Sequence, residues 1–367
     1  MTDASSNIKI VSITDEADFL AIKNVWNELV EVIQPGMLFY RHEWYEAMRK
    51  WHHGACSPYI LLVYKANNLI GICPMMLCHS HHTVLNYRML GFLMIPASPY
   101  HDIICRKTDS QDIMQAVLTY LDEHQTDWDI FDLRHLKNEA LALQYIQDNR
   151  SSIPFSFIIG ATEYDSIIDL SGNWEDYYQQ RSRHLRKNNN NAANRLENMG
   201  NATVHHFSSE ELDDNNIGKL IDEITIIASN SWKSGSANDL SKPAAVEYLC
   251  YLLHQPRLRQ GISLWILRLD DIAIAYEVQL CEHRHVYALH ADFHNSYERL
   301  SPGSYLNHQI IQQLFDSDST TYHMGSGGQP YKKAWENERI DHYQVQIYRK
   351  SVKATALRLL NNIKTFI

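Results

Sequence analysis

Two residues of the chain, His290 and Asp292, have the types and spacing needed to move a proton. They end a predicted strand, where residues two apart face the same side. An imidazole beside a carboxylate can accept a proton from an attacking amine or hydroxyl near neutral pH. A hydrogen-bonded pair that only stabilises the fold has the same spacing, so both interpretations stay open. On the preceding predicted strand, Tyr276, Glu277 and Gln279 could line the cleft for the molecule that attacks.

A strong helix start follows at Ser301-Pro302-Gly303. Ser is favoured as an N-cap and Pro at the first helical position. Gly303 has no Cβ atom to cover the first free backbone N–H groups. Such a helix start attracts phosphate, because its donors and its partial positive charge point outward. The candidate phosphate site consists of the amides of Ser301, Gly303, Ser304 and Tyr305. An ordinary cap without a ligand is the alternative.

A glycine-rich loop, Gly325-Ser326-Gly327-Gly328, comes shortly before Tyr331 and Lys332. Glycine permits positive φ and lets a ligand approach the backbone closely. The Tyr331 phenol could donate a proton to a leaving group, and Lys332 could hold a phosphate or a carboxylate. Tyr331 could also serve only to pack its ring, since the chain has 21 tyrosines.

A predicted helix starting after Asn173 carries Arg183, Arg186 and Lys187, with no acidic residue between positions 181 and 196. The formal net charge of the chain is −10, so this is a local positive strip. It could bind a phosphate-bearing ligand, an anionic glycan or an RNA backbone. A solvated helix face is the other interpretation.

Composition limits the class of protein. The chain has 367 residues, 45% hydrophobic and 21% charged, which is typical of a globular protein with two domains. A net charge of −10 excludes a broadly basic DNA-binding protein. No apolar run approaches the roughly 20 residues of a membrane-spanning helix, and there is no secretory signal. We expect a soluble, cytoplasmic protein with reduced cysteines, no metal site and no transmembrane segment.

The order of predicted elements repeats once along the chain. Each half contains helices, a three-stranded meander, a further helix and a strand. The meanders cover residues 59–91 and 263–293, with hairpin turns at 67–68 and 270–271. The repeat predicts two similar α/β domains, residues 1–170 and 171–367.

Three stretches of the second half resemble the CelD-type acetyltransferase family, a branch of the GNAT superfamily named after cellulose biosynthesis. They are WEDYYQQRSRHLRKNNNNAANRLENMG, HADFHNSYERLSPGSYL and MGSGGQPYKKAW. In that family a Trp precedes a basic helix, a meander strand leads to an SPG helix start, and a Gly-x-Gly loop precedes Tyr-Lys. The resemblance covers residues 166–350 well and the N-terminal half loosely.

The resemblance implies two tandem GNAT-like domains, each a mixed, largely antiparallel sheet flanked by helices. The C-terminal domain would be catalytic and the N-terminal domain a degenerate copy. The implied co-substrate is acyl-CoA, either acetyl-CoA or a longer one, with its pyrophosphate at the Ser301 helix start. Tyr331 lies where many GNAT enzymes place the acid that protonates the CoA thiolate. A small-molecule, glycan or lipid-precursor acceptor would attack the thioester directly through nitrogen or oxygen.

Two alternatives remain open from the sequence. The CelD-type family is related to Fem-type transferases, which have two GNAT-like domains and use aminoacyl-tRNA. In that case the basic helix would contact tRNA. The second alternative is a non-catalytic GNAT-like partner in polysaccharide biosynthesis.

Overall fold

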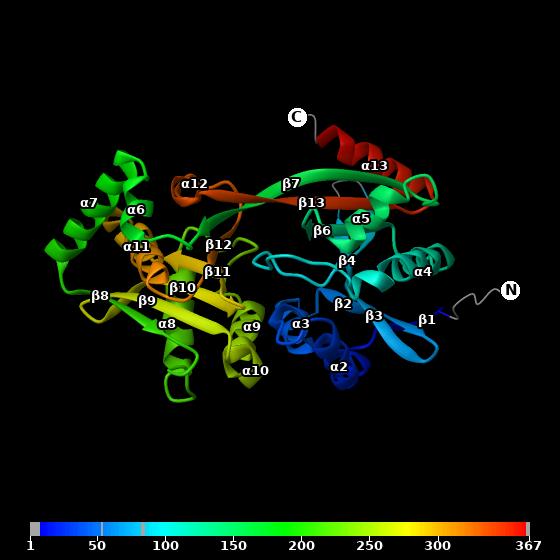
Figure 1. Cartoon of the computed structure of the whole chain (residues 1–367), viewed down its shortest axis with the longest axis horizontal. Helices are drawn as coiled ribbons and strands as arrows, with labels where there is room; N and C mark the ends of the chain where they lie inside the picture. Colours follow the sequence, from blue (N-terminus) through cyan, green and yellow to red (C-terminus); the bar gives the residue numbers. More distant parts are fainter. Residues whose placement is uncertain (1–7, 53, 82–84, 365–367) are drawn as a thin grey trace. The chain divides into compact units, whose positions relative to one another are not determined.

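The computed structural model describes residues 8–52, 54–81 and 85–364 (Figure 1). The chain forms two compact units. The first comprises Met1–Met94, Tyr100–Thr162 and Asp341–Ile367, and the second comprises Ile95–Pro99 and Glu163–Ile340. Each unit is built on a mixed sheet in which most neighbouring strands are antiparallel. The α/β class predicted from the sequence is confirmed.

The first unit contains a three-stranded meander and a strand parallel to its last member. Its strands are β1 (Ile8–Ile13), β2 (Cys56–Lys65), β3 (Asn68–His81), β4 (Asn86–Phe92), β5 (Ile104–Cys105), β6 (Ile130–Leu136) and most of β13 (Glu338–Tyr348). Its helices are α1 (Glu16–Ala21), α2 (Lys23–Ile33), α3 (His42–Trp51), α4 (Ser110–Glu123), α5 (Leu141–Asp148) and α13 (Val352–Lys364). The meander is β2-β3-β4, and β4 and β6 pair in parallel after the crossover through α4.

The second unit repeats this order. Its strands are β8 (Ala202–Phe207), β9 (Ile262–Leu269), β10 (Ile272–Glu282), β11 (His285–Phe293), β12 (Thr321–Ser326) and the end of β7 (Ser156–Asp169). Its helices are α6 (Trp174–Gln179), α7 (Arg183–Met199), α8 (Ile217–Ser229), α9 (Pro243–His254), α10 (Pro256–Arg259), α11 (Pro302–Phe315) and α12 (Pro330–Trp335). The meander is β9-β10-β11, and helix α11 leads to β12, which is parallel to β11. The predicted repeat is therefore present in the structure.

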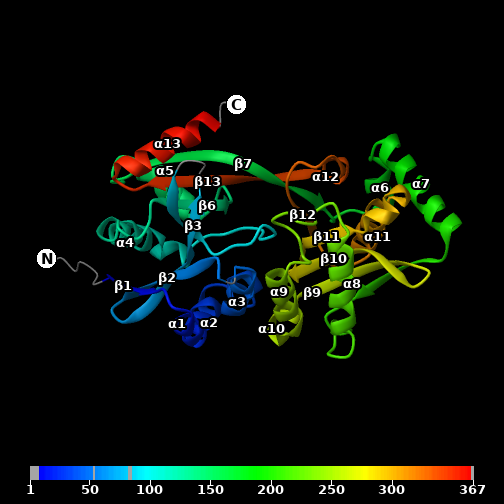
Figure 2. The same ribbon diagram turned by 180° about the vertical axis from the view of Figure 1, so that it is seen from behind.

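Helices cover both faces of the sheet in the second unit. Views from opposite sides show α8 and α9 on one face and α6, α7 and α11 on the other (Figures 1 and 2). Every residue of β9 is buried, which explains why its sequence ISLWILRL is nearly continuously apolar rather than alternating. The core on the α11 face contains Trp265, Tyr322 and Trp335.

Apart from the short segment Ile95–Pro99, the polypeptide passes between the units in two strands. β7 begins in the first unit, and its residues Asp165–Asp169 pair with β12 of the second. β13 follows the second unit in sequence, and its residues Tyr343–Tyr348 pair with β6 of the first. Residues 341–367 therefore belong to the first unit. The division into 1–170 and 171–367 differs from this arrangement, because sequence order does not show that the last strand returns to the first sheet.

Local capping changes two of the predicted helices. The helix expected from Asn173 is divided into α6, capped by Asn173, and α7, whose N-cap Ser182 accepts a hydrogen bond from the backbone N–H of Leu185. The sequence Ser208-x-x-Glu211 has the form of a capping box and predicts a helix start, but α8 begins only at Ile217. Ser208 instead forms a turn in which its backbone N–H and hydroxyl both donate to the Glu211 carboxylate.

The cysteines also differ from the expectation of reduced thiols. Cys56 and Cys78 lie opposite one another in the β2–β3 hairpin and form a disulfide. Their separation of 22 residues does not by itself predict a disulfide, because it is the hairpin register that brings the two cysteines together. No helix within the described residues is long and apolar enough to span a bilayer.

The approach of β4 to β6 depends on Gly91. A Cβ atom at this position would lie 2.6 Å from the backbone oxygen of Asp132, so the two strands would have to move apart. Gly91→Ala should therefore lower the free energy of unfolding by about 1–3 kcal/mol, as measured by urea denaturation. Gly160→Ala is the matched control, since nothing lies within 4 Å of its Cβ position. Equal unfolding midpoints for the two variants would contradict this account.

Candidate active site

The candidate site lies where β11 and β12 separate. The two strands form three parallel pairs, from His285–Thr321 to Tyr287–His323, and then diverge. A cavity of about 550 Å³ opens between them, lined by Ala288–Phe293 of β11 and Met324–Ser326 of β12. This volume is within the usual range for small-molecule sites.

A β-bulge in the meander accompanies the separation. The register between β10 and β11 shifts after Val278, which pairs with His290, while Gln279 pairs with Ala288. Leu289 is thus the extra residue on β11. Bulges bend a strand and increase its local twist, which changes the direction of the side chains that follow.

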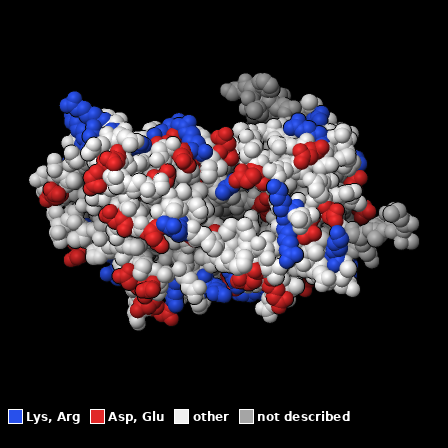
Figure 3. All heavy atoms as spheres, viewed as in Figure 1, with Lys and Arg blue, Asp and Glu red and all other residues white. Residues whose placement is uncertain are grey.

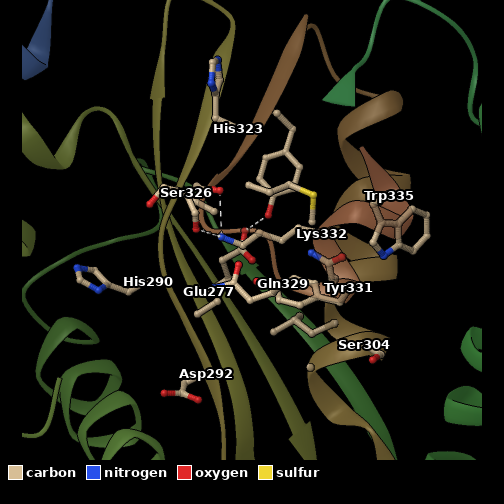
Figure 4. A pocket seen from close by; sticks show the side chains of 18 of the residues that line it. Glu277, His290, Asp292, Ser304, His323, Ser326, Gln329, Tyr331, Lys332 and Trp335 are labelled. Carbon is tan, nitrogen blue, oxygen red and sulfur yellow. Dashed lines mark hydrogen bonds between the residues drawn. The ribbon is translucent and has the colours of Figure 1, made fainter. Parts of the chain in front are cut away.

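The polar side chains of the cavity come from both faces of the sheet. Figure 4 shows His290 and Asp292 on one side of the strands and Tyr331, Trp335 and Ser304 on the other. The cavity is therefore open to groups from the α8–α9 face and from the α11–α12 face.

His290 and Asp292 share a face of β11, as the sequence predicts, but the contacts described for them involve other partners. The His290 Nε2 atom lies 3.4 Å from the Tyr248 hydroxyl. Asp292 accepts a hydrogen bond from the backbone N–H of Phe293, and its other oxygen lies 3.9 Å from Lys233 Nζ. Burial, aided by the charge of Lys233, lowers the pKa of His290 to about 3. The imidazole is therefore neutral and only weakly basic at pH 7.

Glu277 on β10 is buried and held by a chain of hydrogen bonds. Its Oε1 atom accepts bonds from the Tyr322 hydroxyl and from Gln279 Nε2, the latter at 2.6 Å. Gln279 is in turn fixed by the indole N–H of Trp265 at 3.0 Å. Burial raises the pKa of Glu277, although its hydrogen bonds and the nearby lysines oppose the rise.

Two lysines reach the same cavity. Lys332 Nζ donates to the backbone oxygens of Gly325 and Ser326, at 3.0 and 2.8 Å, and so closes the glycine-rich loop. Gly325 and Gly327 in this loop have φ of +79° and +97°, which explains the glycines. Burial lowers the pKa of Lys332 to about 8. Lys233 donates to the backbone oxygen of Ala291, and burial also lowers its pKa.

Tyr331 lines the cavity from the first turn of α12. The residue as a whole is 48% exposed, yet its phenol is close enough to Glu277 and Asp292 to be affected by their charges. Burial, followed by the charges of Glu277 and Asp292, raises its pKa. Tyr331 is thus a protonated donor at neutral pH.

The start of α11 differs in part from the predicted cap. Ser301 has left-handed backbone geometry, with φ of 58°, and its side chain does not cap the helix. Its hydroxyl instead accepts a hydrogen bond from Arg195 at 2.8 Å. Gly303 and Ser304 line the cavity, whereas Ser301 and Tyr305 do not. A Cβ atom on Gly303 would lie 3.2 Å from the Phe293 ring. A larger residue at this position would therefore displace Phe293 even without a ligand.

Two asparagines on the α11 side present unpaired acceptors. Asn189 of α7 and Asn307 of α11 both line the cavity and are 2% and 7% exposed. The amide oxygen of each is buried and has no hydrogen-bond partner. Leaving such a group unpaired costs about 1–3 kcal/mol.

The basic residues predicted on α7 lie outside the cavity lining. Arg183 and Lys187 are exposed, and Arg186 is half-buried. The same helix contributes Ser182 and His184 to the lining. Figure 3 shows basic and acidic side chains interspersed over one face of the molecule, with no broad region of a single sign.

The structure therefore brings together a large part of the predicted set. Cavity-lining members of that set are Tyr276, His290, Asp292, Gly303, Ser304, Gly325, Tyr331 and Lys332. Lys233 and the two asparagines have no recognisable motif, and sequence reasoning missed them. Glu277 was expected in the acceptor cleft with Tyr276 and Gln279; Glu277 and Tyr276 line the cavity, and Gln279 does not. Within the described ranges, no group of three or more His, Cys, Asp or Glu side chains could hold a metal ion.

Residues 183–333 match the model of the acetyltransferase (GNAT) domain family, the CelD-like family that the motifs resemble. This segment is a GNAT domain. It includes α7, the meander, α11, β12 and the first turn of α12, and thus most of the residues that line the cavity. The resemblance drawn from the sequence motifs is confirmed.

Solved structures match nearly the whole chain. The C-terminal domain of a putative lysylphosphatidylglycerol synthetase from Agrobacterium fabrum is 11% identical with a TM-score of 0.56, covering 94% of this chain and 96% of that chain. FemX is 11% identical with a TM-score of 0.53, covering 91% and 96%. L-PGS from Bacillus licheniformis is 12% identical with a TM-score of 0.53, covering 93% and 95%.

At these identities the structural similarity shows the fold alone. Together with the repeated order of elements, it shows the tandem GNAT-like α/β fold predicted from the sequence. A search of curated proteins gave no match.

The low pKa of His290 makes the fold sensitive to acid. Unfolded His290 would take up a proton below pH 6.5, while the folded imidazole stays neutral down to about pH 3. The unfolded state then binds more protons, so stability falls as the pH drops through this window. Between pH 7 and pH 5, the unfolding free energy of the wild type should fall by about 2 kcal/mol more than that of His290→Gln. Urea denaturation at both pH values measures this, and equal losses would contradict it.

Proposed function

We propose that the second unit transfers an acyl group from an acyl-CoA, acetyl-CoA or a longer one, to a nitrogen or oxygen of an acceptor. The acceptor class is a small molecule, a glycan or a lipid precursor. The observation that carries the proposal is the cavity between β11 and β12 in a GNAT domain. Past Tyr287 the backbone of β11 no longer pairs with β12, so an extended arm with amide groups can lie between the strands.

The α11 side of the cavity suits the arm of the donor. Pantetheine contains two secondary amides, and these provide N–H donors for the unpaired oxygens of Asn189 and Asn307. Gly303 and Ser304 at the start of α11 offer backbone N–H groups to the pyrophosphate. Ser301 and Tyr305, which the sequence also suggested for phosphate, lie outside the cavity lining and are less favoured as phosphate ligands.

On this proposal Tyr331 is the acid that protonates the CoA thiolate as the C–S bond breaks. Its raised pKa keeps the phenol protonated before the reaction. Lys332 holds the glycine-rich loop through Gly325 and so fixes the backbone on which the thioester would lie. His290 is too weak a base for the acceptor proton, while Asp292 and Tyr276 could contact the acceptor from the other face.

A second candidate is a Fem-type transfer from aminoacyl-tRNA. The observation that favours it is the pair of exposed cations Arg183 and Lys187 on α7, the helix that also lines the cavity. Filter binding of tRNA tests this candidate. Retention that weakens with salt, and that is lost when both cations are replaced by Ala, would favour tRNA as the donor carrier.

Acyl-CoA should stabilise the protein against heat. At a concentration of 100 times Kd, one site adds about 2.7 kcal/mol to the unfolding free energy. Asn307→Leu should leave the unliganded protein as stable or more stable, because it removes a buried unpaired amide. The same change should weaken acyl-CoA binding roughly fivefold, the worth of one hydrogen bond. Thermal shift and calorimetry measure both effects.

The exposed Gln313 on the same helix provides the control. Gln313→Leu should leave both the thermal shift and the affinity unchanged. A wild-type protein that shows no shift with acetyl-, medium-chain or long-chain acyl-CoA would refute the proposed donor.

Tyr331→Phe removes the proposed acid while keeping the ring. Donor binding should persist, and kcat should fall by roughly 10²–10⁴, the usual effect of a positioned general acid. The loss should appear in kcat more than in KM, because the bond matters in the transition state. A thioester with a more acidic thiol should recover much of the rate. Normal kcat in the Phe variant would leave Tyr331 with a packing role only.

A further inference from the structure

Asp292 and Glu277 both line the cavity, and their carboxylate oxygens differ in how many are hydrogen-bonded or paired. Asp292 has both oxygens engaged, one by the backbone N–H of Phe293 and the other near the Lys233 ammonium. Glu277 receives both of its described hydrogen bonds, from Tyr322 and Gln279, on the single oxygen Oε1. The second oxygen, Oε2, is left for a group in the cavity.

The hydrogen bonds to Oε1 also fix the direction of the Glu277 side chain. Gln279 is held by the buried indole of Trp265, and Tyr322 comes from β12 on the far side of the strand gap. Three residues from three strands thus orient one carboxylate. Figure 4 shows Glu277 close to Lys332.

We propose that Glu277 is the base that accepts the proton of the acceptor in the acyl transfer. This inference rests on the proposed function and adds the residue that the predicted pair of His290 and Asp292 does not supply. Burial of Glu277 supports the role, because it raises the pKa toward the range in which a base is effective.

The proposed reaction returns Glu277 and Tyr331 to their starting protonation states. As the acceptor nitrogen or oxygen forms its bond to the thioester carbon, its proton passes to Glu277 Oε2 and the carbonyl electrons move to the oxygen. The carbonyl reforms, the C–S bond breaks, and the sulfur takes the proton of Tyr331. The Tyr331 phenolate then regains a proton from the Glu277 carboxyl. The net change is transfer of the acyl group to the acceptor and of one proton to the thiol.

The groups around Glu277 predict how the rate depends on pH. Facing it are Tyr322 of β12, Tyr331 and Lys332 of α12, and Lys233 after α8. The hydrogen bond from Tyr322 lowers the pKa of Glu277, as do the charges of both lysines. Tyr322→Phe should therefore raise that pKa and move the acid limb of the kcat profile to higher pH.

The experiment measures thiol release from acetyl-CoA with water, ethanolamine and glucosamine as acceptors, alongside the thermal shift with acetyl-CoA. Glu277→Gln should keep the thermal shift and lower kcat by roughly 10²–10⁴. Tyr322→Phe should displace the acid limb upward, with a smaller loss of maximal kcat than Glu277→Gln. The control is Tyr59→Phe, which removes a tyrosine–aspartate bond of 3.0 Å to Asp127 in the first unit and should leave the profile unchanged.

The outcomes separate the two proposals. A wild-type protein whose melting temperature shifts with neither acetyl-CoA nor medium- and long-chain acyl-CoAs overturns acyl transfer and the role of Glu277 with it. A wild type that binds and reacts, with Glu277→Gln equally active, overturns only the role of Glu277. Loss of activity in Asp292→Asn, together with unchanged activity in Glu277→Gln, would identify Asp292 as the base and overturn the role of Glu277. Should Glu277→Gln unfold, an unmoved acid limb in Tyr322→Phe overturns the inference.

Discussion

The site depends on a parallel pair of strands that begins but does not continue. β11 and β12 pair over three residues because the crossover through α11 places them side by side. The bulge at Leu289 then twists β11 with the meander, and Gly325, at positive φ, turns the end of β12 away. The gap is thus built into the backbone and does not require movement of side chains.

Burial in this gap sets the chemistry of the charged groups. Glu277, Asp292 and Lys332 are buried, and Lys233 is partly buried; burial is the largest cause of each pKa shift. The shifts run toward neutrality, upward for the carboxyls and downward for the ammonium groups. The same physical cause that makes these ions expensive to bury brings their pKa values closer to the pH at which proton transfer is useful.

The two units share their order of elements but not the groups of the site. In the first unit, β4 and β6 repeat the parallel pair and α4 repeats the crossover. The segment after β6 begins Lys137-Asn138-Glu139 and has no glycine loop, and α4 starts without the Ser-Pro-Gly sequence. Duplicated architecture therefore specifies the scaffold, while local sequence in one copy specifies the cavity.

The sequence by itself determined the elements and their repetition, because hydrophobic periodicity and turn residues act over a few positions. It also located Tyr331, Lys332 and Gly325, since glycines before a helix start are a local signal. Only the tertiary structure decided how Glu277 is held, because Tyr322 of β12 bonds it directly and Trp265 of β9 fixes its other partner, Gln279. It likewise decided the return of β13 to the first sheet and the low pKa of His290, since pairing and burial depend on residues distant in sequence.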